Sequence, residues 1–131
     1  MPNSFDQFVV LKPDQGMESL PVTPDLYADL DKNYAGFKSH VLIAAHHFTA
    51  NWPTWEVHPE GDEMVVLLSG SAEFKLRLSS GDQSGHLREP GSFLLVPRNT
   101  WHTALISEPT SILFITPGEG TRNEPVPPAS M

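Results

Sequence analysis

The densest polar cluster of the chain lies at residues 55–63 and reads Trp55-Glu56-Val57-His58-Pro59-Glu60-Gly61-Asp62-Glu63. It leads directly into an apolar run at residues 64–68. Glu56 and His58 are two residues apart, so on a strand their side chains project from the same face. Glu63 follows a turn that contains proline and glycine, and it begins the next strand. Two antiparallel strands joined in this way aim Glu56, His58 and Glu63 into one pocket.

A second turn enters a strand further along, and His102 follows Pro97-Arg98-Asn99-Thr100-Trp101. Imidazole and carboxylate groups are the ligands that a divalent transition metal takes where no thiolate is available, and the chain has no cysteine. The absence of cysteine also excludes a disulfide framework, an iron–sulfur cluster and a cysteine nucleophile. The pattern predicts a metal site formed by Glu56, His58, Glu63 and His102.

The size and charge of the chain restrict its function classes. With 131 residues it suits one domain with a core of its own. Sixteen acidic residues against eight Lys and Arg give a net charge of −8, which repels phosphate backbones and anionic lipid surfaces. We therefore expect neither nucleic acid nor a membrane as a partner. The sequence shows no secretory leader and no apolar run of bilayer length, so we expect a soluble cytoplasmic protein.

Short strand-like runs dominate residues 37–117. The cleanest alternation is at residues 73–78, where Phe74, Leu76 and Leu78 alternate with charged residues. Further strand-like runs lie at residues 37–48, 63–68, 92–96, 103–106 and 111–116, and residues 79–85 have the composition of a hairpin loop. Six or more short strands at close spacing predict an all-β sandwich or barrel.

Two segments flank this region. Residues 1–36 are expected to form an N-terminal extension, with a strand at 8–11 and a short helix that begins after Thr23-Pro24. Residues 118–131 contain several prolines and have nothing to bury, so we expect a mobile tail. The chain is thus divided into an extension (1–36), a barrel (37–117) and a tail (118–131).

Two spaced motifs in residues 37–117 resemble those of the cupin family. The second half of the first cupin motif, His-x-His-x(3,4)-Glu-x(6)-Gly, is matched by His58, Glu63 and Gly70. The second motif, Gly-x(5)-Pro-x-Gly-x(2)-His-x(3)-Asn, is resembled by Gly91, Pro97, Asn99 and His102. The stretch between Gly70 and Gly91 also fits the gap between the motifs in that family.

The resemblance implies an antiparallel β-barrel of the jelly-roll type, with a metal held inside by three histidines and one glutamate. His58, Glu63 and His102 stand at three of these ligand positions, and Glu56 stands where the family has its first histidine. Asn99 replaces a usual glycine. That exchange changes little, because asparagine is the non-glycine residue that best tolerates a positive φ.

Glu56 leaves three interpretations of the site open. As a fourth ligand it would complete a shell of two histidines and two carboxylates. Such a shell neutralises a divalent ion and favours Mn²⁺ or Fe²⁺, with Zn²⁺ and Ni²⁺ also compatible. As a catalytic base it would stand beside a metal with three protein ligands. In the third interpretation the site holds no metal.

Other aromatic and histidine side chains flank the cluster. His46 and His47 are adjacent, so only one of them faces inward on a strand, and we place His47 in the pocket. Trp52, Trp55 and Trp101 are expected either to pack in the core and rim or to form the aromatic wall of a substrate pocket.

We expect a metal-dependent enzyme that acts on a small polar or aromatic molecule, with Fe, Mn, Zn or Ni bound and Glu56 moving a proton. Dioxygenase, isomerase and lyase reactions all stay open. The alternatives are a binding or sensing module without turnover and a structural barrel that has lost its site. We also expect a homodimer, because small single-domain cupins commonly pair and residues 8–11 offer a strand to the edge of a partner's sheet.

Overall fold

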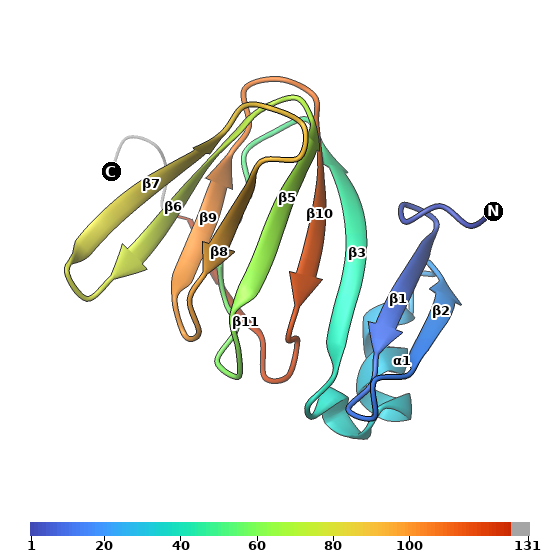
Figure 1. Cartoon of the computed structure of the whole chain (residues 1–131). Helices are drawn as coiled ribbons and strands as arrows, with labels where there is room; N and C mark the ends of the chain where they lie inside the picture. The colour runs from blue at the N-terminus through green and yellow to red at the C-terminus, as the bar shows by residue number, and fades with distance from the viewer. Residues whose placement is uncertain (127–131) are drawn as a thin grey trace.

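The computed structural model describes residues 1–126 and shows two antiparallel sheets that face each other (Figure 1). The six-stranded sheet contains, in spatial order, β2 (Met17–Pro21), β1 (Gln7–Leu11), β3 (Val41–Phe48), β10 (Thr110–Thr116), β5 (Glu63–Ser69) and β8 (Phe93–Val96). The five-stranded sheet contains β11 (Arg122–Pro125), β4 (Thr54–Val57), β9 (Trp101–Leu105), β6 (Ala72–Leu78) and β7 (Gly81–Leu87). The expected all-β architecture of the jelly-roll type is confirmed.

The main hydrophobic core lies between the two sheets. Phe74 and Leu76 of β6 are buried in one cluster with Val65 of β5 and Ile112 of β10, and Leu78 packs against it partly buried. Burying each such side chain contributes about 1.5–3 kcal/mol relative to leaving it exposed. The predicted alternation along residues 73–78 therefore places the apolar side chains on the inner face of the five-stranded sheet.

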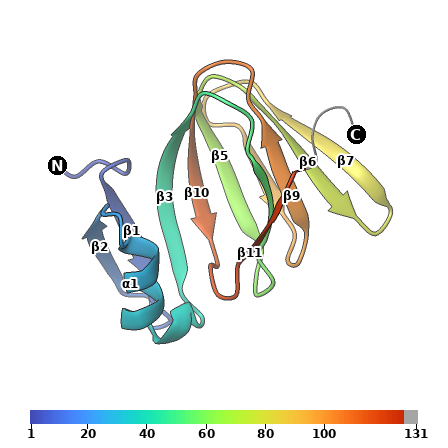
Figure 2. The same ribbon diagram turned by 180° about the vertical axis from the view of Figure 1, so that it is seen from behind.

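The N-terminal extension covers one end of the space between the sheets. Its helix α1 (Leu26–Asn33) turns Leu26 and Leu30, four residues apart, toward one face, where both are buried against Phe8 and Phe37. Figure 2 shows α1 lying on the part of the six-stranded sheet formed by β1, β2 and β3. Within residues 1–126, no helix is both long enough and apolar enough to cross a membrane.

Three segments differ from the expectations. The strand expected from residue 37 begins at Val41, because Ala35–Phe37 form a short 3-10 turn (η1). Residues 81–85, expected in a loop, belong to β7 and pair with β6, so the turn is confined to residues 79–80. Residues 122–125, expected in a mobile tail, form β11 and pair with β4. Both additional strands satisfy backbone groups of a strand that would otherwise be a free edge. Residues 127–131 of the expected tail lie outside the described residues.

Strand β1 has no free edge to offer to a partner. It pairs with β2 on one side and with β3 on the other. The edges of the six-stranded sheet are β2 and β8. The expected route to a homodimer through residues 8–11 is therefore wrong, and the homodimer itself stays a prediction.

Two turns of the motif region depend on left-handed backbone. Gly70 has φ +82°, and a Cβ atom there would collide with the Pro109 carbonyl oxygen and lie 2.8 Å from Thr110 Cα. Asn99 has φ 59°, as expected for an asparagine in place of glycine. Its N–H donates to the His58 carbonyl oxygen at 2.9 Å, so this turn is tied directly to the polar cluster.

Replacing Gly70 by alanine should lower the free energy of unfolding by at least about 2 kcal/mol, because strained φ and a backbone collision act together. Gly91→Ala is the matched control, since Gly91 has φ +89° but no atom within 4 Å of the added Cβ. Urea denaturation of both variants measures the difference. Equal losses in the two variants would contradict the role assigned to the Pro109 contact.

Candidate metal centre

Four predicted side chains meet between the sheets. Glu56 and His102 lie directly opposite each other on β4 and β9, and His58 follows the last residue of β4. Glu63 is the first residue of β5 in the facing sheet. One possible ligand atom from each of the four residues lies within 4.8 Å of the other three. The structure thus brings together the four side chains that the sequence predicts as metal ligands.

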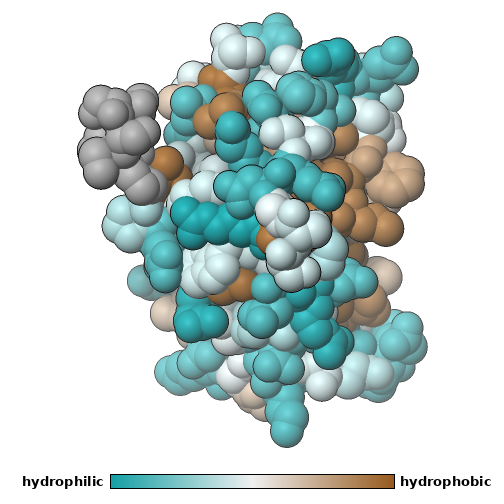
Figure 3. Space-filling view, turned by 90° about the vertical axis from the view of Figure 1, so that its left-hand side faces the viewer, coloured by the Kyte–Doolittle hydropathy of each residue, from teal (hydrophilic) through white to brown (hydrophobic). Residues whose placement is uncertain are grey.

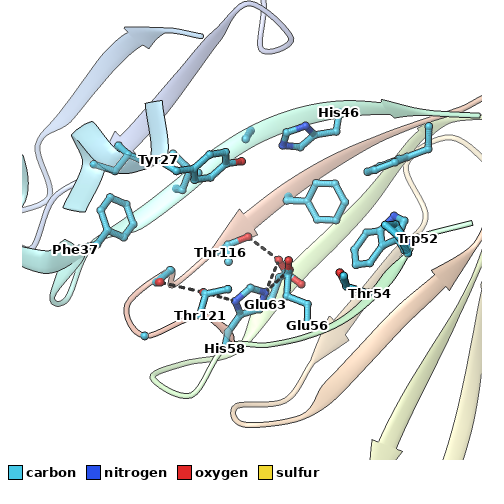
Figure 4. A pocket seen from close by; sticks show the side chains of 18 of the residues that line it. Tyr27, Phe37, His46, Trp52, Thr54, Glu56, His58, Glu63, Thr116 and Thr121 are labelled. Atoms are coloured by element: carbon cyan, nitrogen blue, oxygen red, sulfur yellow. Dashed lines mark hydrogen bonds and ion pairs between the residues drawn. The ribbon is translucent and has the colours of Figure 1, made fainter. Parts of the chain in front are cut away.

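The imidazole and carboxylate groups approach one another closely (Figure 4). His58 Nε2 lies 2.9 Å from Glu56 Oε1 and 3.3 Å from Glu63 Oε2, as the close-up shows. His102 Nε2 lies 3.1 Å from Glu63 Oε1 and 3.9 Å from Glu56 Oε1. His58, Glu63 and His102 are buried, whereas the Glu56 side chain is 27% exposed and faces the adjoining cavity.

The other ring nitrogen of each histidine is already a donor. His102 Nδ1 lies 3.0 Å from the Thr100 carbonyl oxygen, which can only accept, so Nδ1 carries the proton. His58 Nδ1 lies 2.8 Å from Thr121 Oγ1, whose own proton goes to the Gly118 carbonyl oxygen, so this Nδ1 is also the donor. In its neutral form, each ring therefore presents the Nε2 lone pair to the carboxylates.

These residues fit a divalent transition metal. Lone pairs of His58 Nε2, His102 Nε2 and Glu63 Oε1 converge in the interior, and none of the three buried atoms has a hydrogen-bond partner among residues 1–126. Buried hydrogen-bond acceptors that face one another destabilise the fold unless a cation or a proton lies between them. Nitrogen and oxygen ligands, with the distal imidazole nitrogens bonded to the protein, are what a Zn, Mn or Fe site requires.

Without a metal, protons would hold the cluster together. Burial lowers the pKa of His58, but the carboxylates of Glu56 and Glu63 more than offset burial and raise that pKa to about 9. Burial likewise raises the pKa of Glu63, yet His102 and His58 outweigh it and hold that pKa at about 2. Thr116 Oγ1 also donates to Glu63 Oε2 at 2.6 Å and fixes this carboxylate.

Two threonines that sequence reasoning missed support the site. Thr116 orients Glu63, and Thr121 orients His58. Thr121 directly precedes β11 in the segment expected to be a mobile tail. A single threonine gives no signal in a sequence, and only the pairing of β11 with β4 brings this one to the histidine.

A cavity of about 750 Å³ adjoins the cluster, and Glu56, His58 and Glu63 belong to its lining. This volume lies within the usual range of small-molecule pockets. Trp52 lines the cavity, where the prediction of an aromatic wall places it. Its ring packs against Phe74 and Phe114.

Of the other predicted pocket residues, His47 lines the cavity, whereas Trp55 and Trp101 do not. His47 is exposed at the rim of the cavity, where its Nδ1 lies 2.8 Å from Ser111 Oγ, and His46 is the more buried of the two. Trp55 and Trp101 are not among the residues that line the cavity. Each ring instead faces an arginine side chain. The Arg77 guanidinium lies 4.0 Å from the ring centre of Trp55, and the Arg122 guanidinium lies 5.7 Å from that of Trp101. For these two tryptophans the packing alternative therefore holds, because their strand positions alternate with those of Glu56 and His102.

No family model and no curated protein sequence matches the chain. Solved structures do match it. An oxalate decarboxylase of Bacillus subtilis with Mn(II) centres aligns at TM-score 0.55 and 18% identity, over 73% of this chain and 26% of that one. A Klebsiella pneumoniae protein with a double-stranded β-helix domain aligns at TM-score 0.53 and 22% identity, over 66% and 76% of the two chains.

The chain has the double-stranded β-helix fold of the cupins.

A third structure with the cupin fold is a hydroquinone 1,2-dioxygenase in complex with Cd²⁺ and 4-hydroxybenzonitrile. It aligns at TM-score 0.50 and 17% identity, over 58% of this chain and 56% of that one. The chain thus spans about a quarter of the decarboxylase and about half of the dioxygenase. Identities this low establish the fold only. Within this cupin fold, the three residues matched to the motifs, His58, Glu63 and His102, do lie together.

Exchanging Thr121 for valine should weaken Zn²⁺ binding about tenfold to a hundredfold, because His58 loses the acceptor that fixes its tautomer. Thr121→Ser is the control, since it keeps the hydroxyl and should keep the affinity. Competition against a chromogenic chelator measures both. Equal affinities of the valine and serine variants would contradict the positioning role of Thr121.

In chelator-treated protein, the pH dependence of stability should follow the two shifted pKa values. His58 has a raised pKa, so its contribution is complete below pH 6.5 and is lost as the pH rises toward 9. Glu63 has a lowered pKa, so its contribution is present above pH 4.5 and is lost as the pH falls toward 2. Both contributions are complete between pH 4.5 and pH 6.5, so the urea midpoint of unfolding should be highest in that range. A midpoint that does not fall between pH 6.5 and 9 would contradict the pairing of His58 with the two carboxylates.

Proposed function

We propose that the chain binds a divalent transition metal through His58, Glu63, His102 and Glu56 and acts on a small molecule in the adjoining cavity. The single observation that carries this proposal is the convergence of His58 Nε2, His102 Nε2 and Glu63 Oε1, three buried atoms without a hydrogen-bond partner among residues 1–126. Both Nδ1 atoms lie at hydrogen-bonding distance from protein acceptors, so in the neutral rings both Nε2 lone pairs point toward the carboxylates. A cation at that point would satisfy every one of these atoms.

The two carboxylates have different surroundings and therefore different proposed roles. Glu63 is 1% exposed and is held by Thr116, which suits a permanent ligand. Glu56 is 27% exposed, lines the cavity and has Asn123 Nδ2 at 3.3 Å from its Oε2. Glu56 is thus the carboxylate that can reach a molecule in the cavity and take up or return a proton.

The reaction class is an oxygen-dependent cleavage, an isomerisation or an elimination. A bound metal would supply Lewis-acid polarisation of a substrate oxygen. The protein's own part is to orient the substrate against Trp52, to exclude water with the apolar lining and to move a proton at a Glu56 oxygen. Metals are also present in two of the similar structures, with Mn(II) in the decarboxylase and Cd²⁺ in the dioxygenase.

The proposed partner is a small molecule and not a nucleic acid, because the net charge of −8 opposes binding to phosphate backbones. We also propose a cytoplasmic location.

Elemental analysis of untagged protein purified without chelator tests metal binding. Near-stoichiometric Mn, Fe, Zn or Ni is expected in the wild type and should be lost in His58→Ala. His86→Ala is the matched control, because His86 is exposed and lies outside the cluster, with its Nε2 3.6 Å from Glu73 Oε2. Metal absent after reconstitution, or retained in His58→Ala, would contradict the proposal.

Glu56→Gln tests the proton-transfer role. The variant should keep metal with reduced affinity, while turnover falls by about 10²–10⁴-fold, the usual contribution of a general acid or base. Deuterium incorporation from D₂O and oxygen consumption, measured over neutral carbonyl and phenolic compounds, detect the proposed reaction classes. Turnover unchanged in His58→Ala or Glu56→Gln would contradict an enzymatic role. Ligand-dependent stabilisation without product would favour the binding module instead.

A further inference from the structure

The cavity beside the metal cluster has an unusual charge balance. Its charged lining residues are Asp31, Glu56 and Glu63, and no lysine or arginine among residues 1–126 lines it. A metal bound by two carboxylates has its formal charge of +2 neutralised, so it would leave no net positive charge for an anion. Placing a carboxylate substrate beside these groups would bring like charges together in a partly buried space.

Much of the cavity lining is apolar and aromatic. It includes Phe37, Leu42, Phe48, Trp52 and Phe114. Phe48 and Phe114 meet edge to face, and Trp52 tilts against both rings. A flat apolar body the size of one aromatic ring gains contact with such walls.

A second polar end lies across the cavity from the metal cluster. Figure 4 shows Tyr27 and His46 along one side, with His58, Glu63 and Glu56 on the other. Tyr27 comes from α1 and is 60% exposed at the cavity mouth. Burial lowers the pKa of His46 despite the Glu56 charge, so the ring is neutral, and no hydrogen bond to it is formed within residues 1–126. Both side chains are free to bond a polar group of a ligand.

We propose that the cavity selects an uncharged molecule with an aromatic-sized apolar body and a polar group at each end. One polar end meets the metal cluster, and the other is held by Tyr27 and His46. This inference rests on the proposed function, since it assigns the substrate class of the same site. It makes the N-terminal extension part of the binding site, because Tyr27 belongs to that extension.

Calorimetric titration of the full-length protein loaded with Zn²⁺ tests the inference with shape-matched probes. 4-Hydroxybenzamide and 4-hydroxybenzoate differ only in charge at one end, and benzamide lacks the hydroxyl at the other end. We expect 4-hydroxybenzamide to bind at least tenfold more tightly than 4-hydroxybenzoate or oxalate. We expect removal of the hydroxyl to weaken binding about tenfold in the wild type. Tighter binding of either anion, or no binding of the amide, would overturn the inference.

The variant Tyr27→Phe tests whether Tyr27 bonds the second polar group of the ligand or whether the ligand binds through apolar contacts alone. In this variant, the preference for 4-hydroxybenzamide over benzamide should be smaller than in the wild type, because His46 alone still holds the hydroxyl, whereas Tyr34→Phe should behave as the wild type. Tyr34 is the matched control, because it does not line the cavity and its hydroxyl bonds Glu18. Tyr27→Phe with wild-type discrimination would overturn the role of Tyr27. Titration of the metal-free protein with Zn²⁺ keeps the two proposals apart. Failure to bind Zn²⁺ would contradict the metal site alone. The preference for the uncharged over the charged probe tests the cavity.

The outer face of the six-stranded sheet carries no proposal. Phe93 and Leu95 of β8 are 55% and 57% exposed on it, and Figure 3 shows hydrophobic surface gathered along one side of the molecule. Nothing among residues 1–126 shows what covers this face.

Discussion

The orientation of two imidazole rings governs the chemistry of this protein. His58 and His102 each donate Nδ1–H to an acceptor outside the cluster, so their Nε2 lone pairs face the carboxylates of Glu63 and Glu56. In a buried setting such an array is stable only with positive charge at its centre. A proton on His58 can supply that charge, and the carboxylates of Glu56 and Glu63 raise the pKa of His58 to about 9, but a divalent cation satisfies all the acceptors together.

The fold converts this requirement into a defined site. The pairing of β4 with β9 sets Glu56 opposite His102, while β5 begins in the facing sheet with Glu63. The left-handed turn at Asn99 hydrogen-bonds the His58 carbonyl, and the chain before β11 brings Thr121 to the His58 ring. Glu63, Asn99 and Thr121, from three separate segments, therefore fix His58. The helix α1 then bounds the cavity into which Glu56 faces.

Much of the site could be predicted from sequence because its residues lie at strand ends with fixed spacing. The spacing of strands and turns indicates Glu56, His58, Glu63 and His102 as one group, and the resemblance to the cupin motifs adds the ligand positions of His58, Glu63 and His102. The supporting threonines could not be found, because a hydroxyl has no periodic pattern and depends on tertiary contacts. Trp55 and Trp101 do not line the cavity, because their positions on β4 and β9 alternate with those of Glu56 and His102.

The fold was predicted at the level of architecture and of most strands. β7 and β11 were missed since their sequences are polar and lack alternation, and they form because an inner strand offers them unpaired backbone groups. The position of β1 inside its sheet likewise depends on β2, whose largely exposed sequence gives no strand signal.

The most direct measurement is an anomalous-diffraction map of crystals grown with Zn²⁺. We expect one anomalous peak at a metal ion bonded to His58 Nε2, His102 Nε2 and a Glu63 oxygen at about 2.0–2.2 Å, with Glu56 as the fourth ligand. A map without a peak in the cluster, with His58 still bonded directly to the carboxylates, would show that a proton and not a metal holds the site together.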